Sequence, residues 1–250
     1  MSVATNVLGL RSIMRYSSKR LLLNRRWTIV ALVTSLVALV MGYAAVQGDD
    51  LGMGGSALIN LLVLSFLLPV LSMIYGASLI RNDMDDRSIT PVITAPLDRR
   101  TSYLGYYITL VLVVALILLL VNLAGWSSYF LLTSVDGDAL NILLSYSAVL
   151  LIGAVVYSSL FLMLGAVLKQ PMYVGLIYAF VWEGFIGALP GAISNYTLMH
   201  QLKIIATSLL NDGSTIGVAG DAVWSFVALM LVTVLLLAMG ATAFREAEVP

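Results

Sequence analysis

The sequence predicts an all-α, polytopic membrane protein in which all 250 residues form a single transmembrane domain. Three observations support this fold class: the composition, the length of the apolar stretches and the placement of the basic residues. The chain is 60% hydrophobic and only 10% charged, whereas a soluble domain carries about 25% charged residues. Lipid must therefore solvate much of its surface.

Six apolar stretches are long enough to cross a bilayer, because a spanning helix needs about 20 residues for about 30 Å of hydrocarbon. They do not alternate between apolar and polar residues as the strands of a membrane barrel do, so we expect helices. Pro69 predicts a kink in the second stretch, and Trp27, Trp126, Tyr129 and Trp224 are interpreted as interfacial anchors near the stretch ends. The six predicted spans are 27–46, 57–80, 103–131, 141–168, 172–188 and 223–244.

The basic residues give these spans a direction through the positive-inside rule. Of the 13 lysines and arginines, all except Lys203 fall in segments that the six spans place on one side of the membrane. The other side carries aspartates instead, namely Asp49, Asp50, Asp136, Asp138, Asp212 and Asp221. We therefore expect a multi-pass protein of the cell (inner or cytoplasmic) membrane with both termini in the cytoplasm.

The N-terminal segment 6–26 has an amphipathic pattern and precedes the first span. Arg11, Arg15 and Lys19 fall on its polar face, opposite a stripe of apolar residues. Such a pattern predicts an elbow helix that lies in the inner membrane interface.

The segment 189–222 on the outer side is too long for a simple turn. It contains a stripe of leucines and isoleucines at helical spacing, preceded by Ser194 and Asn195, either of which is a suitable helix cap. We expect a short helix that lies on the outer face or dips into it.

The cytoplasmic loop 81–102 combines acidic and basic residues at helical spacing with an apolar patch, and two prolines prevent a long helix. A short coupling helix of this kind can dock into a groove of a cytoplasmic partner. An ordinary solvated loop with inside-positive charges explains the same residues, so the residue chemistry leaves both interpretations open.

The same loop resembles the signature of ABC-2-type permeases, such as the multidrug, antibiotic-export and nitrous-oxide-reductase maturation permeases. That signature contains an acidic residue, a Gly-Thr pair, two apolar residues, Pro-x2-Arg, and a Gly-Lys pair that opens the third span. The matching positions are Asp83, Arg87-Ser88, Val92-Ile93, Pro96, Arg99 and Gly105-Tyr106. Arg87 departs from the glycine of the pattern, and Tyr106 departs from its lysine.

A second resemblance to these permeases covers the end of the fifth predicted span. There Trp182-Glu183 is followed by Leu189-Pro190-Gly191 and a short amphipathic stretch. The resemblance implies short outer helices between spans five and six. It also implies that Trp182, Glu183, Pro190 and Gly191 belong to the translocation path or outer gate.

The resemblance implies the permease subunit of an ATP-driven exporter, working as a homodimer with one cytoplasmic ABC ATPase subunit for each copy. The contacts with that ATPase would come from Asp83, Asp86, Arg87, Ser88, Val92, Ile93, Pro96, Arg99 and Arg100. The chain has no Walker A sequence GxxxxGKS/T, so ATP and Mg²⁺ are expected on the partner, with no cofactor, metal or enzymatic activity on this chain. An extracytoplasmic accessory protein is an optional further partner, and nucleic acid is not expected.

Glu183 is the acidic residue that falls inside a predicted span, where an ionisable group is expensive and faces a partner or a water-filled cavity. One interpretation gives it a role in the translocation path. The other is structural, with hydrogen bonds to the outer helix or to nearby backbone. The glycines and the proline that follow it favour the structural interpretation.

Two other classes of function compete with the permease. An intramembrane enzyme needs paired catalytic groups at one depth, and the spans contain one acidic residue and no histidine. A secondary transporter or channel without an ATPase usually needs several intramembrane ionisable groups or broken helices. The permease is therefore the leading hypothesis.

Overall fold

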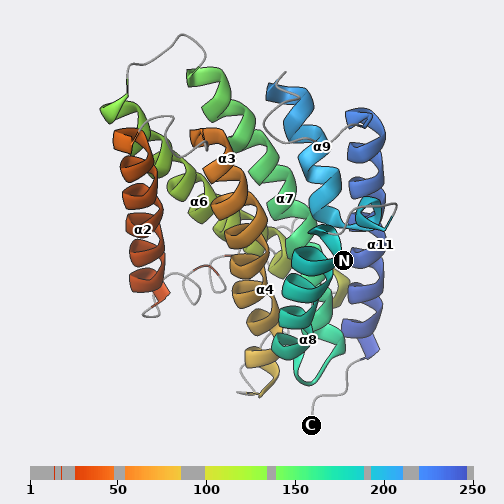
Figure 1. Ribbon diagram of the computed structural model, residues 1–250. Helices are drawn as coiled ribbons and strands as arrows, with labels where there is room; N and C mark the ends of the chain where they lie inside the picture. Colours follow the sequence, from red (N-terminus) through yellow and green to blue (C-terminus); the bar gives the residue numbers. More distant parts are fainter. Residues whose placement is uncertain are drawn as a thin grey trace, which may run out of the picture.

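The computed structural model describes residues 14, 18, 26–47, 54–85, 99–133, 139–188, 193–210 and 220–246. Over these residues it is a helical bundle without strands (Figure 1). The elements are α2 (Arg26–Gln47), α3 (Gly55–Ile59), η2 (Asn60–Leu67), α4 (Leu68–Asp85), α6 (Arg99–Leu132), α7 (Ala139–Val167), α8 (Pro171–Ile177), η3 (Tyr178–Phe185), η4 (Ile186–Ala188), η5 (Ser194–Tyr196), α9 (Leu198–Leu210) and α11 (Ala222–Glu246).

Five helical stretches are long and apolar enough to cross a membrane, which confirms the prediction of an all-helical, membrane-embedded protein. They are Trp27–Gln47, Gly55–Arg81, Arg100–Leu132, Leu140–Val167 and Ala222–Arg245. The remaining predicted span, 172–188, consists of the consecutive segments α8, η3 and η4 and is not one of these five.

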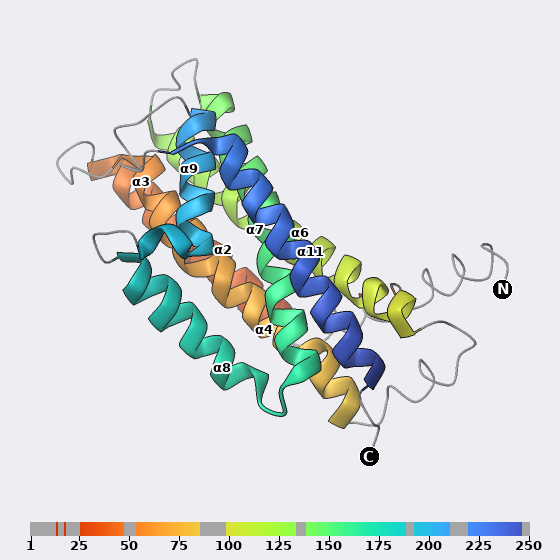
Figure 2. The same ribbon diagram turned by 90° about the vertical axis from the view of Figure 1, so that its right-hand side faces the viewer.

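Helix α7 is the centre of the bundle, because it packs against α4, α6, α8, α9 and α11 (Figures 1 and 2). Its contact with α4 is close at Gly165, where a Cβ atom would lie 3.1 Å from the Ala77 carbonyl oxygen and 3.3 Å from that of Gly76. Small residues allow two helix backbones to approach in this way in a membrane. Helix α2 packs on the side of α6.

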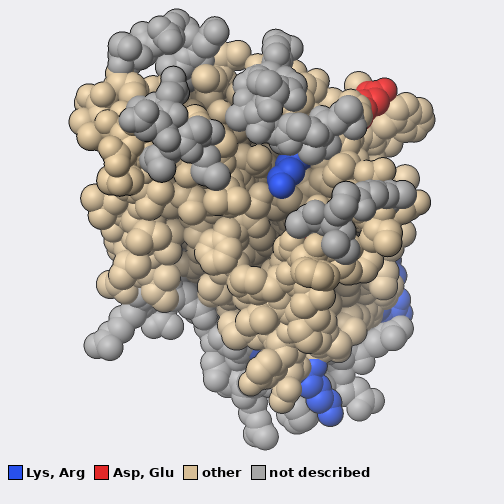
Figure 3. Space-filling view, in the orientation of Figure 1, with Lys and Arg blue, Asp and Glu red and all other residues tan. Residues whose placement is uncertain are grey.

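On the face shown in Figure 3, the few charged side chains of the described residues lie toward the upper and lower parts of the bundle, with a broad uncharged surface between them. The end that we term the basic end is defined by Arg81, Arg100, Lys169 and Arg245. Large exposed apolar side chains are frequent on α2, α8 and α11, the surface expected of helices that face lipid.

The tryptophans follow the anchor interpretation only in part. Trp27 and Trp224 are exposed, the latter by 72%, as interfacial residues should be. Trp126 is only 2% exposed and stacks on Phe130 with ring centroids 5.0 Å apart, so its interpretation as an anchor is wrong. Packing against neighbouring aromatic rings determines its position instead.

The second predicted span contains a π-helix, η2, which ends two residues before Pro69. Proline has no amide hydrogen, and its ring clashes with the carbonyl group four residues earlier in an α-helix. A widened turn just before the proline relieves that clash. This span is therefore irregular where the sequence predicts a kink.

Several predicted features lie outside the described residues. These are the elbow positions Arg11, Arg15 and Lys19, the loop positions Asp86, Arg87, Ser88, Val92, Ile93 and Pro96, and the outer positions Pro190 and Gly191. The backbone of Asp83 continues α4, and Arg99 and Arg100 begin α6, so both helices extend into the predicted loop 81–102.

Candidate functional site

The candidate site surrounds Glu183, the buried acidic side chain of the described bundle. It is only 5% exposed. Its segment buries Pro171, Gly175 and Ala179, which precede Glu183 at intervals of four residues. The small residues Gly175 and Ala179 let the helix approach α4 and α7, since a Cβ atom on Gly175 would already lie 2.9 Å from Met73. Glu183 therefore continues the packed face rather than the exposed one.

The carboxylate of Glu183 accepts three hydrogen bonds. Its Oε1 atom accepts from the Tyr178 hydroxyl at 2.8 Å and from the Leu198 amide at 3.2 Å. Its Oε2 atom accepts from the Met199 amide at 3.1 Å. The structure thus contains the contact with the outer helix that the structural interpretation requires.

The bond from Tyr178 depends on the π-helical form of η3. Tyr178 and Glu183 are five residues apart, and at 100° per residue an α-helix would place them about 140° apart around its axis. The hydrogen bonds of a π-helix also span five residues, so its wider turn brings both side chains to one face. Local backbone geometry therefore assembles this half of the site.

The other half of the site is the N-terminus of α9, where the first amides of a helix have no partner within the helix. Glu183 satisfies two of them, and the hydroxyl of Thr197 accepts from the His200 amide at 3.2 Å. Thr197 is the capping residue, so the prediction of a cap at Ser194 or Asn195 is wrong. Those two residues belong to the preceding turn η5.

Tyr157 approaches the same carboxylate from α7. Its side chain is 0% exposed, and its hydroxyl interacts with the Glu183 carboxylate without reaching normal hydrogen-bond geometry. Glu183 is therefore the group that this buried hydroxyl faces.

Lys203 supplies positive charge one turn further along α9, and its ammonium group is attracted by the Glu183 carboxylate. Burial lowers the pKa of Lys203, and the Glu183 charge opposes that shift. Burial and the Lys203 charge also lower the pKa of His200. Lys203 therefore contributes the positive charge that acts on Glu183 from α9.

The site lies at a break between two helices that follow one another along the bundle. Both views show the helix formed by α8 and η3 toward the basic end and α9 beyond it, beside the longer α11 (Figures 1 and 2). Helix α9 packs against α7 and α11. Broken helices whose N-termini face a charged group form the binding sites of many membrane transporters.

Of the other predicted site residues, Trp182 neighbours Glu183 but is 39% exposed, so the two adjacent side chains do not share a surface. The described structure does not bring Asp83, Arg99 or Arg100 near Glu183. Asp83 lies near the end of α4, and Arg99 and Arg100 lie at the start of α6, toward the basic end of the bundle. The sequence interpretation missed Tyr157, Tyr178, Thr197 and Lys203. Of these four residues, only Thr197 had a usable sequence signal, because a threonine directly before a helical stripe is a common helix cap.

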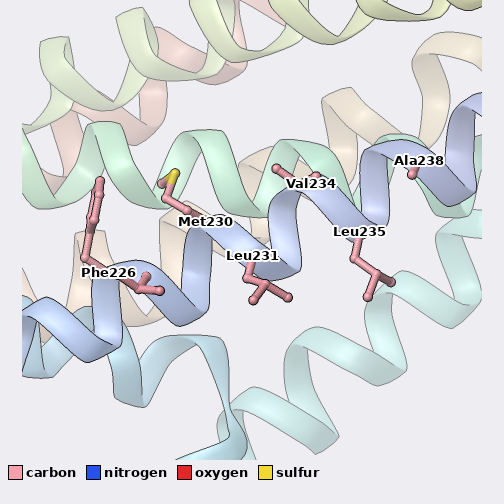
Figure 4. A pocket seen from close by; sticks show the side chains of 7 residues that line it. Phe226, Met230, Leu231, Val234, Leu235 and Ala238 are labelled. Atoms are coloured by element: carbon pink, nitrogen blue, oxygen red, sulfur yellow. The ribbon is translucent and has the colours of Figure 1, made fainter.

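The outer surface of α11 carries a separate open groove of about 610 Å³ (Figure 4). Its lining is apolar and consists of Phe226, Val227, Met230, Leu231, Val234, Leu235 and Ala238. Such a surface suits lipid chains or another apolar helix, and it offers no group for chemistry. In the described part of the chain, no three His, Cys, Asp or Glu side chains cluster as metal ligands would.

A comparison of the sequence with protein-family models finds no matching family, and a comparison with curated proteins finds no matching relative.

Proposed function

We propose that the chain is the membrane-spanning subunit of an ATP-driven ABC exporter whose ATPase is a separate cytoplasmic subunit. In this proposal α8, η3 and η4 form a sixth span, and the basic end faces the cytoplasm with both termini. Two copies pair in the bilayer. ATP and Mg²⁺ bind to the partner ATPase.

The observation that carries the proposal is α9. This short helix returns against α7 and α11 between the fifth and sixth predicted spans, on the far side of the bundle from the basic end. The resemblance to ABC-2-type permeases implies outer helices at this place in the chain. The five apolar helices and the basic end support the same interpretation.

The packing offers a route by which ATPase movement reaches the outer side. The loop 81–102 joins α4 to α6, and α4 packs along α7. Helix α7 in turn contacts α8 and α9 on either side of the Glu183 site, and also α11. A displacement of α4 would change the packing of α7 beneath that site, so two arrangements of the bundle could alternate access.

One observation favours a second function, an ATP-independent transporter or channel. A buried carboxylate at a broken helix is typical of transporters that couple to ions. An intramembrane enzyme is the weakest alternative, because no observation in the described bundle favours it.

Purification of the tagged full-length chain from its native membranes separates the first two functions. We expect a soluble subunit with a Walker A motif and ATPase activity to copurify. Substitutions D83A, D86A and R99A should weaken that association, whereas K169A, at an exposed basic-end position outside the loop, should not. A chain that purifies without an ATPase subunit would refute the permease proposal, and an association that the loop substitutions leave unchanged would refute the predicted contact.

The proposed orientation has its own test, because the chain contains no cysteine. A single cysteine at exposed Asp221 should react with a membrane-impermeant maleimide in intact cells. A single cysteine at exposed Lys169 should react only after permeabilisation. The reverse labelling pattern would invert the topology.

A further inference from the structure

Three buried polar atoms lie where α6 meets the start of η2, and none of them has a hydrogen-bond partner among the described residues. They are the indole nitrogen of Trp126 and the amide oxygens of Asn122 and Asn60, which we term the polar cluster. The side chains of Trp126 and Asn122 are only 2% and 0% exposed. Buried polar groups in native proteins are nearly always hydrogen-bonded, either to the protein or to ordered water.

We propose that the polar cluster is the binding site of one ordered water molecule, which accepts a hydrogen bond from Trp126 and donates one to each asparagine oxygen. A single water satisfies one N–H donor and two carbonyl acceptors, because it has two hydrogens and an oxygen that accepts. The site lies inside one chain, so it depends on neither an ATPase nor a second copy.

Helix geometry and close contacts bring the three groups together. Asn122 and Trp126 are four residues apart on α6, so their Cβ atoms lie on one face of the helix, about 5–6 Å from each other. A Cβ atom on Gly125 would lie 3.3 Å from Cδ1 of Ile59, the residue before Asn60. The start of η2 therefore packs against the turn of α6 that carries the other two groups.

Tyr146 of α7 connects the same two elements. Its ring centroid lies 6.2 Å from that of Trp126, and its hydroxyl donates to the Ser56 carbonyl at 2.8 Å. Ser56 precedes Asn60 by about one helical turn. Helix α7 thus holds the indole and the start of η2 beside one another.

A second residue of α7 determines which atom of Asn122 is left without a partner. The Asn122 amide nitrogen donates to the Ser147 hydroxyl at 3.1 Å, and that hydroxyl donates in turn to the Leu143 carbonyl at 2.7 Å. Because a serine hydroxyl has one hydrogen, Ser147 can only accept from Asn122. The nitrogen therefore faces Ser147, and the oxygen remains for another donor.

The polarity of the three groups selects a neutral ligand. A cation would be attracted by the two amide oxygens but repelled by the hydrogen of the Trp126 indole. An anion would be attracted by that hydrogen but repelled by both oxygens. Water both donates and accepts, so it avoids each of these conflicts.

Water-edited solid-state NMR of the full-length, ¹⁵N-labelled chain in lipid bilayers tests the site. The chain has four tryptophans, and the variants W27F, W182F and W224F, all at exposed positions, assign the Trp126 indole signal by elimination. We expect water magnetisation to reach the Trp126 indole at short mixing times, although its side chain is buried. If the transfer is no greater than that to the backbone amide of buried Val121, the cluster binds no water and the proposal is wrong.

Two variants make the same chemical change inside and outside the cluster. N122L should lower the transfer to the level of the Val121 amide, whereas N141L, at an exposed position of α7, should leave it unchanged. Tyr146 and Ser147 keep their hydroxyls in N122L, so the loss would also exclude a relay through exchanging hydroxyl hydrogens. Undiminished transfer in N122L would overturn the proposal.

The variant N60L keeps the test decisive if N122L does not fold, because Asn60 is only half-buried. Removing one of the two acceptors should weaken the binding of the water and reduce the transfer to the Trp126 indole. Unchanged transfer in N60L would show that Asn60 does not bind the water and would refute the three-group site. A failed association with an ATPase would leave all these results unchanged, so this test is separate from that of the proposed function.

Discussion

Two tyrosines beside one carboxylate offer a matched pair of substitutions that each remove a single hydroxyl. Tyr178 donates to Glu183 at 2.8 Å, whereas the buried Tyr157 hydroxyl has no hydrogen-bond partner. We predict that Y178F destabilises the protein and that Y157F does not. The comparison isolates the hydrogen bond, because both changes leave an aromatic ring in place.

The magnitude follows from the chemistry of each hydroxyl. A hydrogen bond to a charged group contributes about 1.5–3 kcal/mol in soluble proteins, and bonds between membrane helices average about 0.6 kcal/mol. Tyr178 is half-buried, so we expect Y178F to cost about 1–2 kcal/mol. Y157F removes an unsatisfied buried group and should leave the free energy of unfolding unchanged or raise it by up to about 1 kcal/mol.

Thermal unfolding of both variants in nanodiscs measures the difference. For a chain of this length, about 1 kcal/mol corresponds to roughly 2–4 °C, so the midpoint of Y178F should fall by about 2–8 °C. The midpoint of Y157F should stay level or rise. Equal losses in the two variants would show that Tyr157 bonds to the carboxylate as strongly as Tyr178 does and would refute this reasoning.

Two further predictions concern the packing around the site. G165A should destabilise the protein by about 1–3 kcal/mol relative to G184A, because its Cβ meets the α4 backbone at 3.1 Å while that of Gly184 meets only a carbonyl oxygen at 3.6 Å; equal unfolding midpoints would contradict the close contact. The pair G187C/T197C should form a disulfide under mild oxidation in this otherwise cysteine-free chain, because a Cβ on Gly187 would lie 3.9 Å from Cβ of Thr197, within the usual span of a disulfide. Protease cleavage between the two positions separates the chain into two fragments unless the disulfide joins them. Separate fragments on a non-reducing gel would show that η4 and the start of α9 are not in contact.

Hydropathy predicted the spans well because burial in lipid requires long apolar runs, and the five confirmed helices match such runs closely. Hydropathy predicted the ends of the helices less accurately. Helix α4 continues through Asp83 and α6 begins at Arg99, since backbone hydrogen bonding does not stop where the apolar surface stops. The same limit explains Trp126, whose sequence position near a span end does not show whether it meets an interface or a core.

The candidate site was predictable only in its central residue. An acidic residue within an apolar run identified Glu183, because the cost of burying its charge is visible in the sequence. Tyr178 was missed because an α-helical interpretation places it about 140° away from Glu183. Tyr157 and Lys203 approach from other elements, and only the tertiary packing of α7 and α9 brings them to the carboxylate.

The energetics of the site explain how an apolar bundle tolerates both a buried charge and a broken helix. Alone, the carboxylate of Glu183 would be expensive to bury, and the free amides at the start of α9 would each cost about 1–3 kcal/mol. Together each satisfies the other, through the bonds to Leu198 and Met199. An unbroken helix would have no free amides at this position and would need no buried carboxylate. The break therefore makes the start of α9 depend on one side chain for two of its amides, although the rest of α9 is attached by its packing against α7 and α11.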